Sequence, residues 1–207
     1  MYDLINNMFD INILNYNINL NNRQTEKEGL IKVAEHLSIS KKRASIAYEI
    51  ARIKNNKIIK AKKIVNNNKL NSEKIKILLV SHSYNTYDEF IGKPIIKLFE
   101  GMNVEIIYSD QFDTTLTRHA SKKLSNTLYW KYSKESIGSI ILSKGKIDGI
   151  VFLSTFPCGL DSLVNELVMR SLNLPYLNIV IDDLDSLSGV ETRIESFVDI
   201  LEQKIKN

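Results

Sequence analysis

Residues 149–170 read GIVFLSTFPCGLDSLVNELVMR, and the architecture of the chain can be worked out from this stretch. An apolar run over residues 147–153, rich in β-branched side chains, is typical of a strand that is buried on both faces. Pro157 in the turn that follows cannot continue a helix. Asp161 can cap a helix predicted over residues 161–172. Cys158 is therefore expected between the end of a buried strand and the start of a helix.

Strands and helices alternate on both sides of this stretch. Strands are predicted over residues 75–80, 104–108, 147–153 and 176–181, and helices over residues 88–99, 117–128, 131–142, 161–172 and 190–205. Such alternation predicts a parallel sheet with right-handed crossovers. We therefore predict an α/β domain over residues 73–207, a four-stranded parallel sheet in a flavodoxin-like or Rossmann-like three-layer sandwich.

An N-terminal helical arm is predicted before this domain. In residues 1–24, Asn alternates with apolar residues, which predicts a weakly ordered, extended arm or an exposed edge strand. Residues 25–72 are expected to form a helical hairpin and a polar linker. Thr25 and Glu28 have the spacing of a capping box for the first helix. The second helix is predicted over about residues 41–65, and the linker over residues 66–72.

The charge of the chain does not indicate nucleic-acid binding. There are 28 Lys and Arg against 24 Asp and Glu, a net charge of only +4. The hairpin resembles a helix-turn-helix in outline, but its second helix is longer than a usual recognition helix and its lysines are spread around it. A solvated arm that packs on the domain or on a partner is the favoured interpretation.

The compartment is inferred from what the sequence lacks. A single cysteine excludes an internal disulfide. The N-terminus has no basic region followed by an apolar core, so no signal peptide is recognised. No apolar run approaches the roughly 18 residues of a membrane span. We therefore expect a cytoplasmic protein without a membrane partner.

Polar residues follow three of the predicted strands, whose carboxyl ends share one edge of a parallel sheet. Ligands bind at this edge in open α/β sheets. The residues concerned are Asn85, Tyr87 and Asp88 after the first strand, Pro157, Cys158, Gly159 and Asp161 after the third, and Asp182, Asp183 and Asp185 after the fourth. Their convergence predicts a site. The alternative is that strand-end loops are polar in any protein and that Asp is favoured at helix starts.

Common catalytic motifs are absent from the sequence. There is no GxGxxG after the first strand and no P-loop. Of the three histidines, only His82 lies at a predicted strand end, and a zinc site would need more Cys or His than the chain has. The position of Cys158 allows two interpretations, a reactive thiolate or a structural residue. A helix N-terminus favours its thiolate, but free cysteines are also commonly small buried apolar residues.

Three stretches resemble a known family. Residues 81–89, SHSYNTYDE, resemble the motif HPYNxYDE. Residues 148–162, DGIVFLSTFPCGLDS, resemble DGIxxLxSFxCGPDS, and residues 192–199, TRIESFVD, resemble TRLEAFxDML. The family is that of the activase-related proteins of the 2-hydroxyacyl-CoA dehydratase system, described as CoA enzyme activase domains. The resemblance covers about residues 25–205 and is to the C-terminal half of these proteins.

The resemblance implies an anaerobic iron–sulfur context. In the related dehydratases an ATP-dependent activator delivers one electron to a [4Fe–4S] component that dehydrates a 2-hydroxyacyl-CoA. Cys158 takes the place of a cluster ligand, and the implied cofactor-binding residues are Asn85, Tyr87, Asp88, Gly159, Asp161, Ser162 and Asp182. The expected partners are a cysteine-bearing homologous subunit, the ATP-dependent activator and an acyl-CoA.

Two departures from the family pattern affect the implied chemistry. The family loop DEHTGEAG is replaced by residues 182–189, DDLDSLSG, which lack its His and second Glu, and Leu160 replaces a Pro. The first hypothesis is a subunit, inactive alone, that gives Cys158 to a [4Fe–4S] cluster shared with a partner chain. The second is a remnant or assembly module without metal. The third is a metal-free acyl-CoA or small-molecule domain, which Asp88 and Asp161 disfavour at the helix N-termini.

Overall fold

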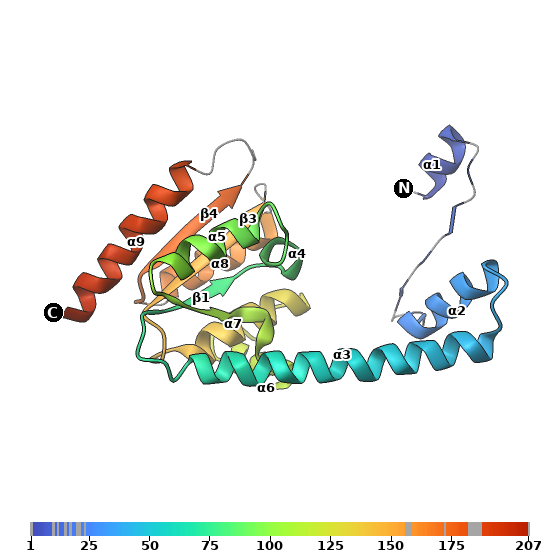
Figure 1. Cartoon of the computed structure of the whole chain (residues 1–207), viewed down its shortest axis with the longest axis horizontal. Coiled ribbons are helices and arrows are strands. Elements are labelled where there is room, and N and C mark those ends of the chain that lie inside the picture. The colour runs from blue at the N-terminus through green and yellow to red at the C-terminus, as the bar shows by residue number, and fades with distance from the viewer. Residues whose placement is uncertain are drawn as a thin grey trace. The chain divides into compact units, whose positions relative to one another are not determined.

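The structure is a computed structural model, and it describes residues 2–9, 11, 13, 14, 16, 18, 19, 22, 24–155, 159–171, 173–181 and 188–206. The chain divides into two compact units, Met1–Lys60 and Ala61–Asn207. Figure 1 labels the elements of both units.

Unit 2 is built on a four-stranded, all-parallel sheet. The strands are β1 (Lys76–Val80), β2 (Glu105–Tyr108), β3 (Gly149–Thr155) and β4 (Tyr176–Ile181), in the order β2-β1-β3-β4. Figure 1 labels β1, β3 and β4. In the register of the sheet, Leu78 of β1 lies opposite Ile107 of β2 and Ile150 of β3. Parallel pairing with helical crossovers confirms the predicted α/β architecture.

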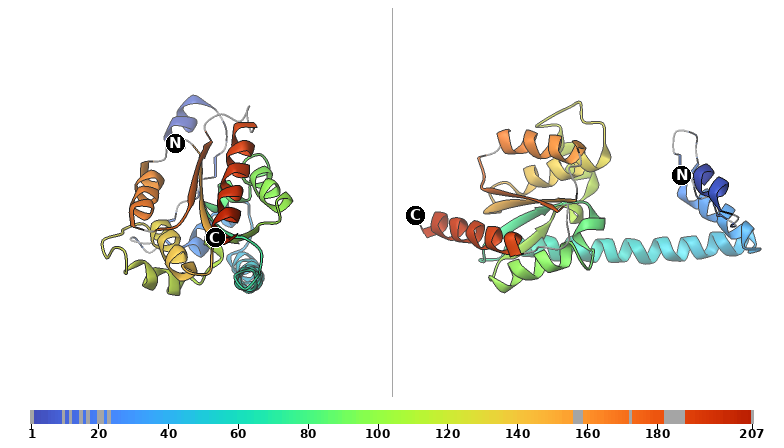
Figure 2. Two further views of the ribbon diagram at one scale, coloured as in Figure 1. Left: turned by 90° about the vertical axis from the view of Figure 1, so that its left-hand side faces the viewer. Right: turned by 90° about the horizontal axis from the view of Figure 1, so that it is seen from above.

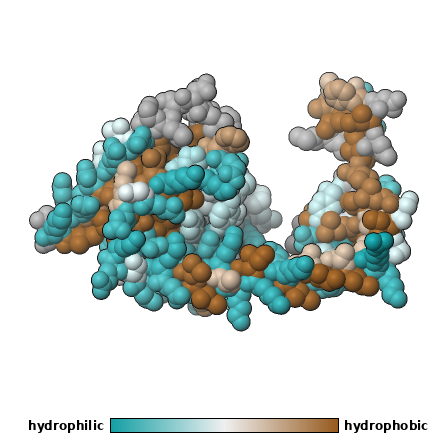
Figure 3. All heavy atoms as spheres, viewed as in Figure 1, coloured by the Kyte–Doolittle hydropathy of each residue, from teal (hydrophilic) through white to brown (hydrophobic). Residues whose placement is uncertain are grey.

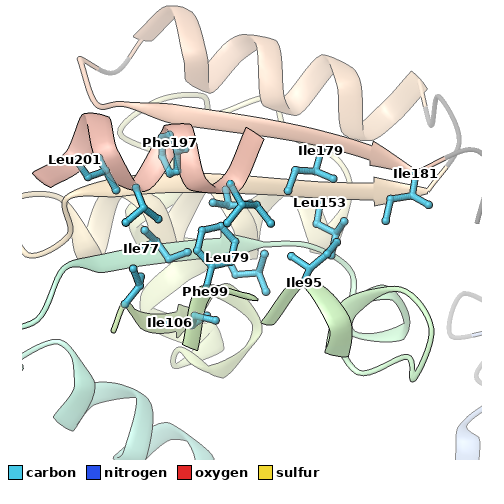
Figure 4. Close-up of a cluster of buried hydrophobic side chains, with 14 residues drawn as sticks. Ile77, Leu79, Ile95, Phe99, Ile106, Leu153, Ile179, Ile181, Phe197 and Leu201 are labelled. Carbon is cyan, nitrogen blue, oxygen red and sulfur yellow. The ribbon is translucent and has the colours of Figure 1, made fainter. Parts of the chain in front are cut away.

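Helices cover both faces of the sheet. On one face lie α5 (Gly92–Gly101) and α9 (Ser188–Lys206), and on the other α7 (Lys131–Ser143) and α8 (Gly159–Ser171), as the left view of Figure 2 shows. The first face buries a cluster that includes Ile77, Leu79, Ile95, Phe99, Ile179 and Phe197 (Figure 4). Alternate residues of β1 supply the other face, since successive side chains of a strand point to opposite sides. The three-layer sandwich is thereby confirmed.

The predicted helix boundaries shift where a capping residue lies. The helix expected over residues 117–128 is α6 (Thr114–Ser121), because the Asp113 carboxylate accepts hydrogen bonds from the amides of Thr115 and Leu116 at 2.9 and 3.2 Å. The helix expected to begin at Asp88 is α5, which begins at Gly92. Asp88 instead accepts hydrogen bonds from the amides of Phe90 and Ile91, in the turn before α5.

The long helix α3 (Lys41–Lys69) ends on the edge strand β2. The Asn66 side chain, fully buried, pairs with the backbone of Tyr108: Nδ2 donates to its carbonyl at 3.0 Å, and Oδ1 accepts from its amide at 2.8 Å. Lys69 donates to the Ile106 carbonyl and pairs with Glu105 at 2.9 Å. The polar linker predicted over residues 66–72 is therefore wrong for residues 66–69, which are helical and cover the open edge of the sheet.

Unit 1 contains α1 (Tyr2–Met8), α2 (Glu26–His36) and the first part of α3. The capping box at Thr25 and Glu28 is confirmed, with both of its hydrogen bonds present. The alternating N-terminal residues were expected to be extended, but residues 2–8 are helical, and residues 19 and 24 form an isolated antiparallel bridge. Among the described residues, no helix combines the length and the apolar character needed to cross a bilayer.

Candidate functional site

A cavity of about 320 Å³ opens at the carboxyl ends of β1 and β2. Its lining comes from the loop after β1, from the 3₁₀ turn η2 (Ser109–Gln111) after β2, and from the first turns of α7. The lining residues are Ser81, His82, Ser83, Ser109, Asp110, Lys131, Tyr132, Glu135 and Ser136. In the sheet β1 lies between β2 and β3, and the crossovers from β1 to β2 and from β2 to β3 run in opposite directions. The cavity therefore lies near the topological switch point of the sheet.

His82 joins three elements at this edge. Its Nε2 lies 3.2 Å from Oδ1 of Asp161 in the first turn of α8, and Asp161 is only 5% exposed. The imidazole stacks on Tyr132 of α7, with ring centroids 3.5 Å apart, and on Tyr84 at 4.9 Å. Because an ionised carboxylate can only accept, this contact favours the tautomer of His82 that carries its proton on Nε2. The imidazole orientation is thus fixed by a carboxylate and by two aromatic rings.

Asp110 organises the side of the cavity formed after β2. Its Oδ2 accepts from the Ser83 hydroxyl at 2.9 Å, and its Oδ1 accepts from the Tyr87 hydroxyl at 3.1 Å. The side-chain amide of Gln111 donates through Nε2 to the same Tyr87 oxygen at 2.9 Å. Lys62 of α3 lies 4.3 Å from the centroid of the Tyr87 ring, a cation–π contact. Asp110 is therefore already engaged by two hydroxyl donors.

The phenols of the site stay protonated. Burial raises the pKa of Tyr87, and the negative charge of Asp110 raises it further. Burial also raises the pKa of Tyr132, with a smaller contribution from the charge of Asp161. Neither side chain can serve as a phenolate base near neutral pH, so both act as hydrogen-bonding and stacking groups.

A second contact ties the loop after β1 to the end of β3. Asn85 is buried, and its Oδ1 accepts from the hydroxyl of Thr155, the last residue of β3, at 3.1 Å. Together with the contact between His82 and Asp161, it anchors the loop to both ends of the connection between β3 and α8. The residues of this connection, 156–158, lie outside the described part of the chain.

The structure brings together some of the predicted site residues and not others. Asn85, Tyr87 and Asp161 take part in the contacts above. The Asp88 carboxylate accepts from the amides of Phe90 and Ile91 and lies outside these contacts, and Gly159 and Ser162 are exposed at the start of α8. Cys158 and Asp182 lie outside the described residues, as do Pro157, Asp183 and Asp185. Whether these residues bind a cofactor stays a prediction.

The half of the cavity that follows β2 is not among the residues predicted from the sequence. The predicted site takes residues from the loops after the first, third and fourth strands, although a parallel sheet places the carboxyl end of the second at the same edge. Asp110 could have been found from that rule. Lys131 and Glu135 come from a helix whose first turn carried no sequence signal for a site. Among the described residues, no group of three or more His, Cys, Asp or Glu side chains is placed to hold a metal ion.

Comparison with known proteins gives one match. A family model described as "CoA enzyme activase uncharacterised domain" matches residues 1–112, which is more than half of the 207-residue chain. The matched range includes unit 1, β1, β2 and the SHSYNTYDE stretch, and it ends before α7 and β3. No curated protein and no solved structure matches the chain.

Proposed function

The chain belongs to the CoA enzyme activase uncharacterised domain family, and from that premise we propose that it is an iron–sulfur-associated subunit of an activase-related electron-transfer system. In this proposal Cys158 supplies one ligand to a [4Fe–4S] cluster, and a partner chain supplies the rest. An ATP-dependent activator and an acyl-CoA substrate, which the family resemblance implies, would act on the assembled complex.

The observation that carries the proposal is the place of the only cysteine. In the sequence, Cys158 stands between Thr155, which ends β3, and Gly159, which begins α8. This is the connection whose two ends are anchored by Asn85 and His82. A thiolate in such a strand-to-helix connection is favoured by the helix dipole and is a soft ligand suited to iron.

The residues of this chain do not fit a cluster held by the chain alone. A [4Fe–4S] cluster is held by four thiolates, and the sequence has one cysteine. The described residues around the strand ends add His82, Asp110 and Asp161 but no assembled group of three metal ligands. We therefore assign one ligand to this chain, derive no reaction step from the cluster, and expect no activity from the chain by itself.

Unit 1 supports a role as one subunit of a complex. In the described part of unit 1, only Gly29 and Ala34 are buried. The apolar side chains of α2 and of the first part of α3 are exposed (Figure 3); we call Leu30, Leu37, Ile46, Ile50 and Ile53 the unit 1 apolar surface. A helical segment that buries so little cannot offset the entropy of ordering it, which favours a partner that covers this surface.

The same observation favours a second candidate, an assembly module that binds the partner without a metal. Both candidates predict a complex, and they differ only in iron. The test is iron and acid-labile sulfide content, with a visible spectrum, on protein purified without oxygen. It is done on the chain alone and after co-expression with a cysteine-bearing homologous chain encoded beside it.

The shared-cluster proposal expects no iron in the isolated chain and about four irons per complex. Cys158→Ser should lower the iron content of the complex and alter its spectrum, because serine replaces one thiolate. Cys158→Ala separates loss of a ligand from replacement by a weaker oxygen ligand. A complex that forms normally but holds no iron, with Cys158→Ser indistinguishable from wild type, would overturn the proposal and leave the assembly module.

A further inference from the structure

The long helix α3 concentrates the positive charge of the chain. It carries ten Lys and Arg side chains and one Glu, whereas the rest of the chain has 18 Lys and Arg against 23 Asp and Glu. The small net charge of the whole protein therefore conceals a strongly basic helix on an otherwise acidic chain. Every residue of α3 from 50 to 62 is exposed, so this charge lies on the surface of the described structure.

Half of these cations have no partner within the described residues. Four of the ten make ion pairs, and Lys62 lies over the ring of Tyr87. The remaining five form no ion pair with any residue that the structure describes, and all of them belong to unit 1: Lys42, Arg43, Lys54, Lys57 and Lys60. They leave unit 1 with a charge that acidic side chains of a partner would neutralise.

One stripe of α3 combines apolar and basic side chains. Six residues follow one another at intervals of three or four, the heptad spacing that keeps side chains on one face of a helix. They form what we call the α3 seam: Arg43, Ile46, Ile50, Ile53, Lys57 and Lys60. The three isoleucines at its centre are each more than half exposed. A seam of this kind is typical of a helix that pairs with another helix.

The charges at the ends of the α3 seam disfavour a second copy of this chain as the occupant. A parallel pair in register would place Lys57 and Lys60 each against its own copy. An antiparallel pair aligned on the isoleucines would bring Arg43 close to Lys60. Like charges that face each other across such a seam are unfavourable, and natural coiled coils use them to exclude wrong partners. The complementary occupant is therefore a different, acidic chain.

We propose that the α3 seam docks an acidic amphipathic helix of a partner protein. Apolar side chains of that helix would cover the isoleucines, and its carboxylates would face the basic residues at both ends. Burial of the isoleucines would supply affinity, and the charge pairs would set orientation and register. Lys42 and Lys54 flank the seam and would add further pairs. This inference takes from the proposed function that unit 1 has a partner, but it depends neither on iron nor on Cys158.

The test titrates the full chain into a fluorescein-labelled synthetic peptide of three heptads. The peptide has leucine opposite the isoleucines of the seam, and glutamate opposite Arg43, Lys57 and Lys60 and at the flanking positions. Its anisotropy should rise to saturation, and the affinity should fall as salt is added, because salt screens exposed charges. A peptide with lysine in place of each glutamate should not bind. The absence of saturable binding by the acidic peptide overturns this inference and leaves the iron test of the proposed function unaffected.

Two variants and one control locate the binding on the α3 seam. Ile50→Gln and the double variant Lys57→Glu/Lys60→Glu should each weaken peptide binding by about tenfold or more. The first removes apolar surface that binding would bury, and the second opposes the carboxylates of the peptide. Lys122→Glu/Lys123→Glu makes the same change of charge on exposed residues of unit 2 and should bind within about twofold of wild type. If the control weakens binding as much as the seam variants, only overall charge matters and the proposal fails.

Two further measurements address the other occupants of a basic helix. A double-stranded oligonucleotide, titrated under the same conditions, should bind more weakly than the acidic peptide. Nucleic acid is bound mainly through its phosphates, so tighter binding of the oligonucleotide, unchanged by Ile50→Gln, would overturn the proposal in favour of nucleic acid. Sedimentation of the free chain should show no self-association through the seam. A dimer that Ile50→Gln dissociates would show that a second copy is the occupant.

Discussion

At the scale of single residues, Asn66 shows how one side chain can replace part of a sheet. Its amide makes the two hydrogen bonds to Tyr108 that a neighbouring strand would make. This role is not visible in the sequence, because Asn66 belongs to an Asn-rich run that has the composition of a linker. What distinguishes it from Asn67 and Asn68 is only the face of α3 on which it lies.

Asn66→Ala should lower the free energy of unfolding of unit 2 by about 2 kcal/mol, because it leaves an amide and a carbonyl of β2 without partners. Asn67→Ala, one position along the same helix and exposed, should change it by less than about 0.5 kcal/mol. Urea unfolding followed by the fluorescence of Trp130 measures both. Equal costs for the two variants would show that the amide pairing contributes nothing.

His82 is a residue whose importance the sequence indicated only in part. Its position at a strand end was visible in the sequence, but its partners Asp161 and Tyr132 lie 79 and 50 positions further along the chain. Such contacts depend on the positions that helices α7 and α8 take when they pack on the sheet, and the sequence pattern does not give these positions. The sequence therefore predicted the edge at which a site would form and not the set of side chains that line it.

At the scale of elements, α6 and α7 pack unusually closely. A Cβ added to Gly138 of α7 would lie 1.9 Å from the carbonyl oxygen of Thr117 in α6. Four other buried residues of α7 are also small, the serines at positions 133, 136, 139 and 143. The hydroxyls of Ser139 and Ser143 bond back to carbonyls one turn earlier, so they are buried without needing the neighbouring helix.

Gly138→Ala should therefore destabilise unit 2 by about 3 kcal/mol, because the contact is with backbone that cannot move aside easily. Gly101→Ala is the matched control: Gly101 ends α5, and nothing lies within 4 Å of its added Cβ. The control should be neutral or stabilising by up to about 1 kcal/mol. Thermal unfolding of the two variants compares them, and a tolerated Gly138→Ala would contradict the close packing.

Elements with a clear hydrophobic period are the ones that the sequence predicts well. β4 and the apolar stripe of α9 are predicted closely, because a half-exposed edge strand and an amphipathic helix carry their period in the sequence. The end of α3 was missed because its helix is held by contacts with β2 rather than by an apolar stripe. α1 was missed because alternation with Asn was read as a strand period.

At the scale of the whole molecule, the two units differ in how their hydrophobic residues are used. Unit 2 buries two clusters, one on each face of its sheet. The described residues of unit 1 bury only Gly29 and Ala34, and α3 is exposed at every position from 50 to 62. A helix this exposed is held mainly by its own backbone hydrogen bonds, which are marginal in water without packing.

In the free chain, backbone amides of α2 and of residues 41–60 should therefore exchange with deuterium much faster than those of β1 and β3, because local opening needs little buried surface to be exposed. Hydrogen exchange followed by mass spectrometry of peptides measures this. In the complex with the cysteine-bearing partner, protection of unit 1 should rise while that of β1 and β3 stays the same. Amides of α2 already as protected as β3 in the free chain would contradict both the marginal stability of unit 1 and the need for a partner to cover it.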